Sequence, residues 1–120
     1  MRLDNKIIGL TFAGGALGSM LRYGLDFLTP NNLVLLFVVN VLGAALLGFV
    51  AARGEIFTDA ARSFWGTGVA GGFTTMSAVA LWFAVEGAFA QWAFSMVATM
   101  FILGLLAYFG AHKLTQKLSR

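Results

Sequence analysis

The chain has 120 residues, of which 59% are hydrophobic and 11% are charged, with a formal net charge of +3 and no cysteine. A soluble domain of this length cannot bury so much apolar surface, because a small globule leaves much of its area facing water, so the surplus must face lipid. The basic residues stand at the ends of apolar runs, which indicates membrane orientation rather than nucleic-acid binding. The lack of cysteine excludes disulfides and thiolate metal sites.

Four apolar runs follow one another, each close to the roughly 20 residues that a membrane-spanning helix needs. In chain order the expected helices cover residues 7–28, 33–52, 63–85 and 92–111, with an amphipathic stretch before the third and a basic tail after the fourth. The start resembles a signal peptide, but three further runs favour a first transmembrane helix. The runs lack the alternation of barrel strands. We therefore expect an all-α membrane protein, with one four-helix transmembrane domain over residues 1–120.

Small residues recur four positions apart in every expected helix, a spacing that lets helix backbones approach closely in lipid. The pairs are Gly14 and Gly18, Ala44 and Gly48, Gly68 and Gly72, and Ala107 and Ala111. Glycine is common in membrane helices, which would account for one or two such pairs. Four pairs in four helices predict a compact bundle.

Arg22 and Asn40 are strongly polar residues within the apolar runs, where burial in lipid is costly. Arg22, late in the first run, is either an interfacial anchor whose charge reaches water or a positive charge at a pore mouth or dimer seam. Asn40, about two turns into the second run, either hydrogen-bonds another helix or offers free amide N–H groups to an anion. The residues alone leave both pairs of alternatives open.

The third run is weakened in its middle, at residues 71–77, by the sequence Gly-Gly-Phe-Thr-Thr-Met-Ser. Non-helical backbone at membrane depth survives only where protein buries it or where it lines a cavity. Carbonyls that such a break releases can coordinate a hard cation such as Na⁺. The alternative is an unbroken helix whose threonines bond back to the preceding turn, and the residue chemistry favours neither.

Catalytic residues do not form a recognisable set in this sequence. The single histidine, His112, stands in the basic tail, where a surface role is more probable than a ligand role. Neither a Ser/His/Asp set nor a metal-ligand cluster nor a phosphate loop can be assembled from the residues. We therefore expect that the protein is not an enzyme.

Taken together, these features resemble the Fluc (CrcB) family of fluoride channels in length, helix count and motif order. Each motif alone is weak, but three in order within a four-helix chain are specific. The motifs are Gly14-Gly15-x-x-Gly18-Ser19-x-x-Arg22-Tyr23, Val39-Asn40-x-x-Gly43 and Gly71-Gly72-Phe73-Thr74-Thr75-x-Ser77.

The resemblance implies an antiparallel dimer with two pores, a third helix broken at mid-membrane and a structural Na⁺ held by the carbonyls of Gly71 and Thr74. It also implies passive conduction, since donors and ring edges can replace the water of a small anion and still let it leave. Asn40 would match the pore asparagine, and Arg22 the arginine near the aqueous entrance. Ser77 would be a further pore residue.

The chain departs from the family pattern at positions that line the pore. The family usually has phenylalanine where this chain has Met76 and Val79, and threonine where it has Ala78. Trp82 stands at a position where the family has glutamate, and the fourth helix lacks the usual serine track. These replacements remove aromatic edges and hydroxyls that would contact fluoride.

Three functions are compatible with these features. A fluoride channel subunit comes first, and a non-conducting assembly subunit of such a channel comes second because of the altered pore positions. A small multidrug exporter has a similar length and helix count. It needs a membrane-embedded carboxylate for proton coupling, and the runs here are essentially free of carboxylates.

The basic residues also predict one fixed orientation in the inner (plasma) membrane. Four spans put both termini and the 53–62 segment on one side. The basic residues expected on that side are Arg2, Lys6, Arg53, Arg62, Lys113, Lys117 and Arg120, against at most Arg22 on the other. The positive-inside rule then places both termini in the cytoplasm. A chain so unevenly charged would not insert both ways, so we expect an oppositely oriented sister subunit that could supply the aromatics missing at Met76 and Val79.

Overall fold

The computed structural model describes residues 4–30, 32–85 and 91–119, and its regular structure there is entirely helical. The elements are α1 (Asn5–Leu28), α2 (Leu33–Ala52), α3 (Asp59–Arg62), the π-helical η1 (Ser63–Ala70), α4 (Gly71–Phe73), α5 (Met76–Val85) and α6 (Gln91–Leu118). They lie within about two residues of the expected helices, except at the end of the fourth. Residues 86–90, between the third and fourth expected helices, and the side chain of Trp82 lie outside the described parts.

Side-chain caps fix where the first two helices begin. The Asp4 carboxylate accepts the Ile7 N–H at 2.8 Å, and the Asn32 amide oxygen accepts the Val34 N–H at 2.9 Å. Such caps satisfy N–H groups that have no partner in the first turn of a helix. The cap at Asp4 explains why α1 begins two residues before the apolar run.

The fourth helix continues beyond the end expected at residue 111, so that prediction is wrong by two turns. α6 runs to Leu118. The tail lacks glycine and proline, and lysine and leucine are good helix formers. Lys117 in the last turn also carries a favourable charge for the negative end of the helix dipole. The polar composition of the tail marks the end of the apolar stretch, but the helix continues.

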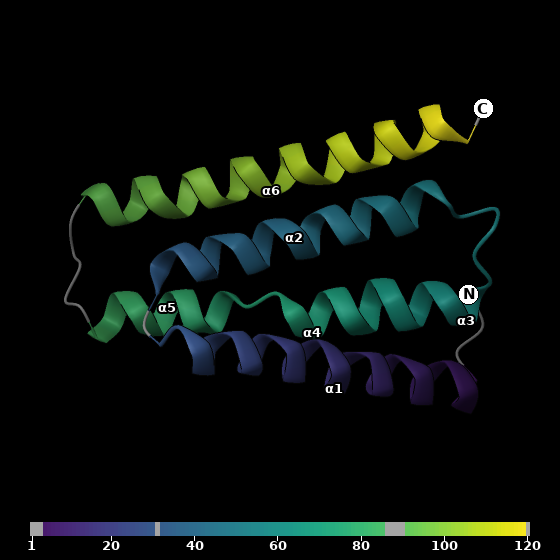
Figure 1. The fold of residues 1–120 in the computed structure, drawn as a ribbon, viewed down its shortest axis with the longest axis horizontal. Helices are drawn as coiled ribbons and strands as arrows, with labels where there is room; N and C mark the ends of the chain where they lie inside the picture. The colour runs from purple at the N-terminus through teal and green to yellow at the C-terminus, as the bar shows by residue number, and fades with distance from the viewer. Residues whose placement is uncertain (1–3, 31, 86–90, 120) are drawn as a thin grey trace.

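The helices lie side by side in an order that differs from their order along the chain (Figure 1). η1 packs against both α1 and α2, and α2 packs in turn against α6. The start of α1, the turn between α2 and α3 and the end of α6 lie at one end of the molecule (Figure 1). The basic residues Lys6, Arg53, Arg62, Lys113 and Lys117 therefore belong to that end.

Glycines let the backbones of α1 and the third run touch. A Cβ atom on Gly14 would overlap the carbonyl oxygen of Phe64, and one on Gly72 would overlap that of Gly15. A Cβ atom on Gly68 would lie 2.9 Å from the Gly14 Cα. The predicted pairing of small residues is confirmed for this interface, because contacts this short exclude any side chain.

At the α2–α6 interface, a glycine of α2 likewise lets two backbones touch. A Cβ atom on Gly48 would overlap the Tyr108 carbonyl oxygen, and the Ala44 Cβ lies 3.9 Å from the position that a Cβ would take at Gly104. Towards the other end of this interface, Leu36, Val79 and Met100 form a buried cluster. This cluster ties α5 to α2 and α6.

Among the described residues, three segments are long and apolar enough to cross a membrane: Leu33–Ala52, Asp59–Val85 and Phe94–Leu118. α1 falls short because its glycines and Arg22 lower its hydropathy, so this property is shown for three of the four expected spans. Large apolar side chains cover the outside of α6. They are Phe94, Phe101, Ile102, Leu103, Leu105, Leu106, Phe109, Leu114 and Leu118. A surface of this kind fits lipid or a partner chain.

Candidate functional site

The third span is interrupted near the middle of the molecule. α4 ends at Phe73 and α5 begins at Met76, and the ribbon between them is extended (Figure 1). Thr74 has φ −77° and ψ 152°, which is extended backbone, and its N–H donates the last helical bond, to Ala70 O at 3.1 Å. Two residues of this span, Thr74 and Thr75, therefore lie outside both flanking helices.

The side chain of Asn40 binds the main chain at this interruption. Its Oδ1 accepts the Thr75 N–H at 2.8 Å, and its Nδ2 donates to Thr75 O at 3.2 Å. The same Nδ2 donates to Leu36 O at 2.9 Å and lies 3.4 Å from the Met100 sulfur. Asn40 thus connects α2, the interruption and α6.

These partners also fix the orientation of the amide. Only the oxygen can accept an N–H, and only the NH₂ group can donate to two carbonyls. Both hydrogens of Asn40 Nδ2 are directed at carbonyl oxygens, those of Leu36 and Thr75. Of the two alternatives for Asn40, the structure therefore shows hydrogen bonding to another segment rather than free amide donors, because carbonyl oxygens accept both hydrogens.

Thr75 starts the second half of the span. Its hydroxyl accepts the Ala78 N–H at 3.1 Å, as an N-cap does, and lies 3.2 Å from the Ser77 hydroxyl. The residue is only 6% exposed. Sequence reasoning missed this role, although a threonine immediately before the first residue of a helix is a recognisable N-cap signal.

The first half of the span is held against α1 by Ser19, which sequence reasoning also left without a role. Its hydroxyl donates to Gly72 O at 3.4 Å. Thr74 packs its methyl group onto Gly43 of α2, where a Cβ atom would overlap Thr74 Cγ2. Gly72, just before the interruption, therefore contacts α1, and Thr74, within the interruption, contacts α2.

The carbonyls of Gly71 and Thr74 were candidates for holding a cation. Gly71 is exposed, and a Cβ there would meet nothing within 4 Å. The hydrogen bond to Gly71 O that the structure shows comes from the Thr74 hydroxyl at 3.4 Å, which is long. Neutral oxygens at the C-terminal end of a helical segment suit a hard cation, so these residues fit Na⁺ chemically. Within the described residues, His, Cys, Asp and Glu form no group that could hold a metal.

An open, mostly apolar groove of about 300 Å³ lies beside the interruption, between α2, α5 and α6. Asn40 and Met76 line it together with Tyr108, and Met76 is 48% exposed. Ser77 is exposed as well. The structure therefore brings three of the five predicted pore residues, Asn40, Met76 and Ser77, to the region around the interruption.

The other two predicted pore residues lie elsewhere. Val79 is only 3% exposed and packs with Leu36 and Met100, so it is a core residue of the single chain. Arg22 is half-buried in α1, one turn beyond the contact that Gly18 makes with η1, and its Nε lacks a hydrogen-bond partner. Val79 is buried and Met76 is exposed although they lie three positions apart in α5, a difference that the sequence did not indicate.

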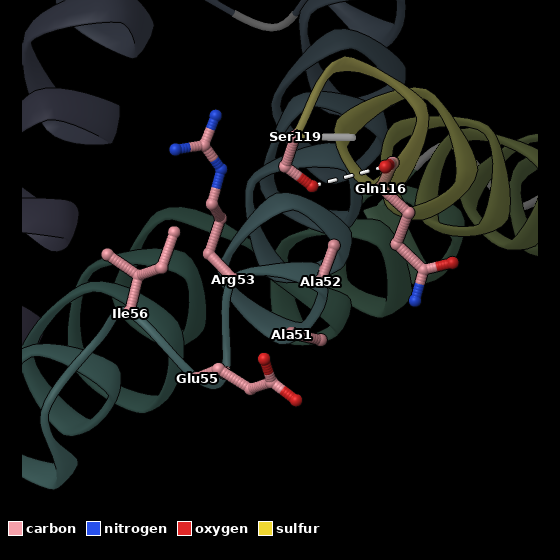
Figure 2. Close-up of a pocket in the computed structure, with 8 residues that line it drawn as sticks. Ala51, Ala52, Arg53, Glu55, Ile56, Gln116 and Ser119 are labelled. Carbon is pink, nitrogen blue, oxygen red and sulfur yellow. Dashed lines mark hydrogen bonds between the residues drawn. The ribbon is translucent and has the colours of Figure 1, made fainter.

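A polar pocket of about 500 Å³ marks the end of the molecule that carries the termini (Figure 2). Arg53 and Glu55 come from the turn after α2, and Gln116 and Ser119 from the end of α6 (Figure 2). The Arg53 guanidinium also lies 5.5 Å from the ring centre of Phe49. This end has the polar surface that water contact requires.

The fold defines a membrane protein built from long apolar helices, one of them interrupted. The model of the family described as "CrcB-like protein, Camphor Resistance (CrcB)" matches residues 9–111. The chain belongs to the CrcB family, as the motifs around Arg22, Asn40 and Gly71 indicated. No solved structure shows a significant match to the chain.

Several curated relatives carry the name fluoride-specific ion channel. FluC of Caulobacter vibrioides (strain NA1000 / CB15N) is 34% identical over 125 residues, covering 94% of this chain and 97% of the relative. FluC 1 of Listeria monocytogenes serotype 4b (strain F2365) is 36% identical over 109 residues, covering 80% and 86%. FluC 2 of Corynebacterium jeikeium (strain K411) is 38% identical over 95 residues, and the match spans little more than half of that relative, 56%. A family of ion channels fits the expectation of a protein that is not an enzyme.

Proposed function

We propose that this chain is a subunit of a fluoride-specific ion channel that lets fluoride leave the cell passively. The observation that carries the proposal is family membership over residues 9–111, together with relatives named as fluoride channels. The interrupted span beside a groove adds support, since irregular backbone inside a membrane protein is tolerated where it lines a cavity or is buried.

The pore would run past Asn40, Met76 and Ser77, with Arg22 near the aqueous entrance. Val79 is left out of this set because its side chain is buried between α2 and α6. The exposed Ser77 hydroxyl at the interruption offers a polar contact to an anion, and the groove beside it is mostly apolar. A small anion that exchanges its water for such contacts can still leave.

A structural Na⁺ would be held by the carbonyls of Gly71 and Thr74. Two neutral oxygens from one chain are too few for a hard cation, which takes about six or more oxygen ligands when it is the size of Ca²⁺. The same two carbonyls of a second, antiparallel subunit would bring the oxygens that the protein supplies to four. When bound, the ion would neutralise the partial negative charge of the carbonyls that meet there.

The second subunit would be an oppositely oriented sister chain. Basic residues gather at the end that holds the termini and the α2–α3 turn, and that end also carries the polar pocket around Arg53 and Gln116. Such an imbalance favours one orientation in the inner (plasma) membrane, with both termini in the cytoplasm. An antiparallel dimer of two such chains would require one of them to insert against this bias.

A second candidate function is a non-conducting assembly subunit. Two observations favour it: both amide hydrogens of Asn40 are engaged by carbonyls, and Met76 stands where the family has a pore phenylalanine. In this case the sister chain would line the conducting pore, and this chain would supply half of the dimer and of the Na⁺ site.

Fluoride efflux from liposomes tests these alternatives. Purified chain alone and chain co-expressed with a sister are reconstituted at equal protein density, and efflux is recorded with a fluoride electrode, with chloride as the control anion. Fluoride-selective efflux from this chain alone supports a conducting subunit, because an assembly subunit would conduct only together with its sister. Efflux from the sister alone, unchanged when this chain is added, would overturn both the channel and the assembly role.

A further inference from the structure

The interruption depends on two N–H groups that are diverted from helical partners. In an unbroken α-helix each N–H donates to the carbonyl four residues earlier. The Thr75 N–H would then donate to Gly71 O, and the Ala78 N–H to Thr74 O. In the structure the first donates to Asn40 Oδ1 at 2.8 Å and the second to the Thr75 hydroxyl at 3.1 Å.

The acceptors left behind are the carbonyls of Gly71 and Thr74. We propose that Asn40 and the Thr75 hydroxyl keep the third span interrupted by capturing the N–H groups of Thr75 and Ala78, and so keep these two carbonyls available to a hard cation. The cation part rests on the proposed function. Asn40 is thereby a positioning residue, acting on the cation site through the Thr75 main chain rather than by touching the ion.

The geometry of the Asn40 contact selects the interrupted form. Within a helix, the N–H and C=O of one residue point in opposite directions along the axis, so a single amide cannot reach both. Asn40 binds the N–H and the C=O of the same residue, Thr75. The two bonds therefore exist only while Thr75 is not helical, and both are lost if the span closes into one helix.

Burial makes this contact consequential. Thr75 is buried, and Asn40 is half-buried against Leu36 and Met100. A buried N–H without a partner destabilises the fold, so a Thr75 N–H that loses Asn40 is expected to donate to another acceptor. Gly71 O is the acceptor that helical geometry offers, and the bond to it that the structure shows is a long one from the Thr74 hydroxyl.

Three variants of the full-length chain in bilayers, together with one matched control variant, test the inference. Asn40→Leu removes the acceptor, whereas Asn40→Asp keeps an oxygen that can accept the Thr75 N–H. Asn40→Leu combined with Thr75→Pro removes the N–H itself, and proline also disfavours a helical conformation of the residue before it. Asn40→Leu with Thr75→Val is the matched control, which loses the hydroxyl but keeps the N–H.

The first readout is the ¹³C chemical shift of Thr74 Cα and Cβ, which separates extended from helical backbone without reference to any ion. We expect extended values in the native chain and in Asn40→Asp, helical values in Asn40→Leu and in the Thr75→Val control, and extended values again with Thr75→Pro. Extended values in Asn40→Leu would overturn the proposal. If Asn40→Leu does not fold, loss of the extended values in Asn40→Asp would overturn it equally.

The second readout is thermal unfolding in Na⁺ compared with N-methylglucamine. A Na⁺ concentration 100 times its dissociation constant stabilises a one-site protein by about 2.7 kcal/mol. We expect Na⁺ to raise the melting temperature of the native chain, Asn40→Asp and the Thr75→Pro double variant, and not that of Asn40→Leu. If Na⁺ does not raise the melting temperature of the native chain, the cation site is refuted. The Thr74 chemical shifts would still decide whether Asn40 controls the interruption.

Discussion

Gly18 of α1 lies so close to Val69 of η1 that a Cβ atom on Gly18 would overlap the Val69 carbonyl oxygen. The same Cβ would lie 2.8 Å from the main-chain nitrogen of Phe73, at the end of α4. Both obstacles are backbone atoms, which cannot move aside as the end of a side chain can. This contact seats α1 against the part of the third span that leads into the interruption.

Gly18→Ala is therefore expected to destabilise the protein by at least about 1–3 kcal/mol, the usual range for overpacking. Thermal or denaturant unfolding in detergent would measure it. Gly9→Ala is the matched control in the same helix, since a Cβ there meets nothing within 4 Å. The control is expected to be neutral or stabilising by up to about 1 kcal/mol, because alanine favours a helix over glycine. Equal effects at Gly18 and Gly9 would contradict this packing.

The contact between Gly43 and Thr74 gives a compensating pair. A Cβ on Gly43 would overlap the Thr74 methyl group, whereas its next contacts, Ala70 O at 3.5 Å and Thr74 Cβ at 3.6 Å, are ordinary. Gly43→Ala is expected to destabilise by about 1–3 kcal/mol. Adding Thr74→Ser removes the methyl and is expected to restore most of that loss. Additive effects in this double-mutant cycle would show that the two residues do not touch.

Asn40→Asp is expected to lower fluoride flux while leaving assembly intact. A carboxylate about 4 Å from an anion repels it by about 1 kcal/mol in water and about 4 kcal/mol near a protein surface. The corresponding loss in flux is at least about fivefold, at roughly 1.4 kcal/mol per factor of ten. Liposome efflux and gel filtration would measure flux and assembly. Unchanged flux would mean that the anion does not pass Asn40, whose role would then be confined to the Thr75 main chain.

A single orientation in the membrane can be tested with single cysteines, because the chain contains none of its own. Ser119→Cys reports the end that carries the termini, and Thr29→Cys reports the opposite end. Both positions are exposed. In intact cells, a membrane-impermeant maleimide is expected to label the cysteine at position 29 and not the one at 119. Comparable labelling of both, together with fluoride flux from this chain alone, would contradict the heterodimer.

Much of the architecture could be predicted from the sequence, because it depends on local properties. Run length and apolar content located all four helices, and the spacing of Gly14, Gly18, Gly68 and Gly72 predicted close backbone contact. The motifs also identified the family correctly. The end of α6 was missed because the end of an apolar stretch is not the end of helical propensity.

The site, in contrast, was decided by tertiary structure. The sequence left open whether Asn40 bonds another segment or faces an anion, and whether the third span is continuous. These two questions have a single answer here, since the partner of Asn40 is the main chain of Thr75, 35 residues away. Hydrogen-bond competition between such distant groups has no local signature. Val79 likewise became a core residue only because α5 docks against Leu36 of α2 and Met100 of α6, a packing that no period or motif within α5 specifies.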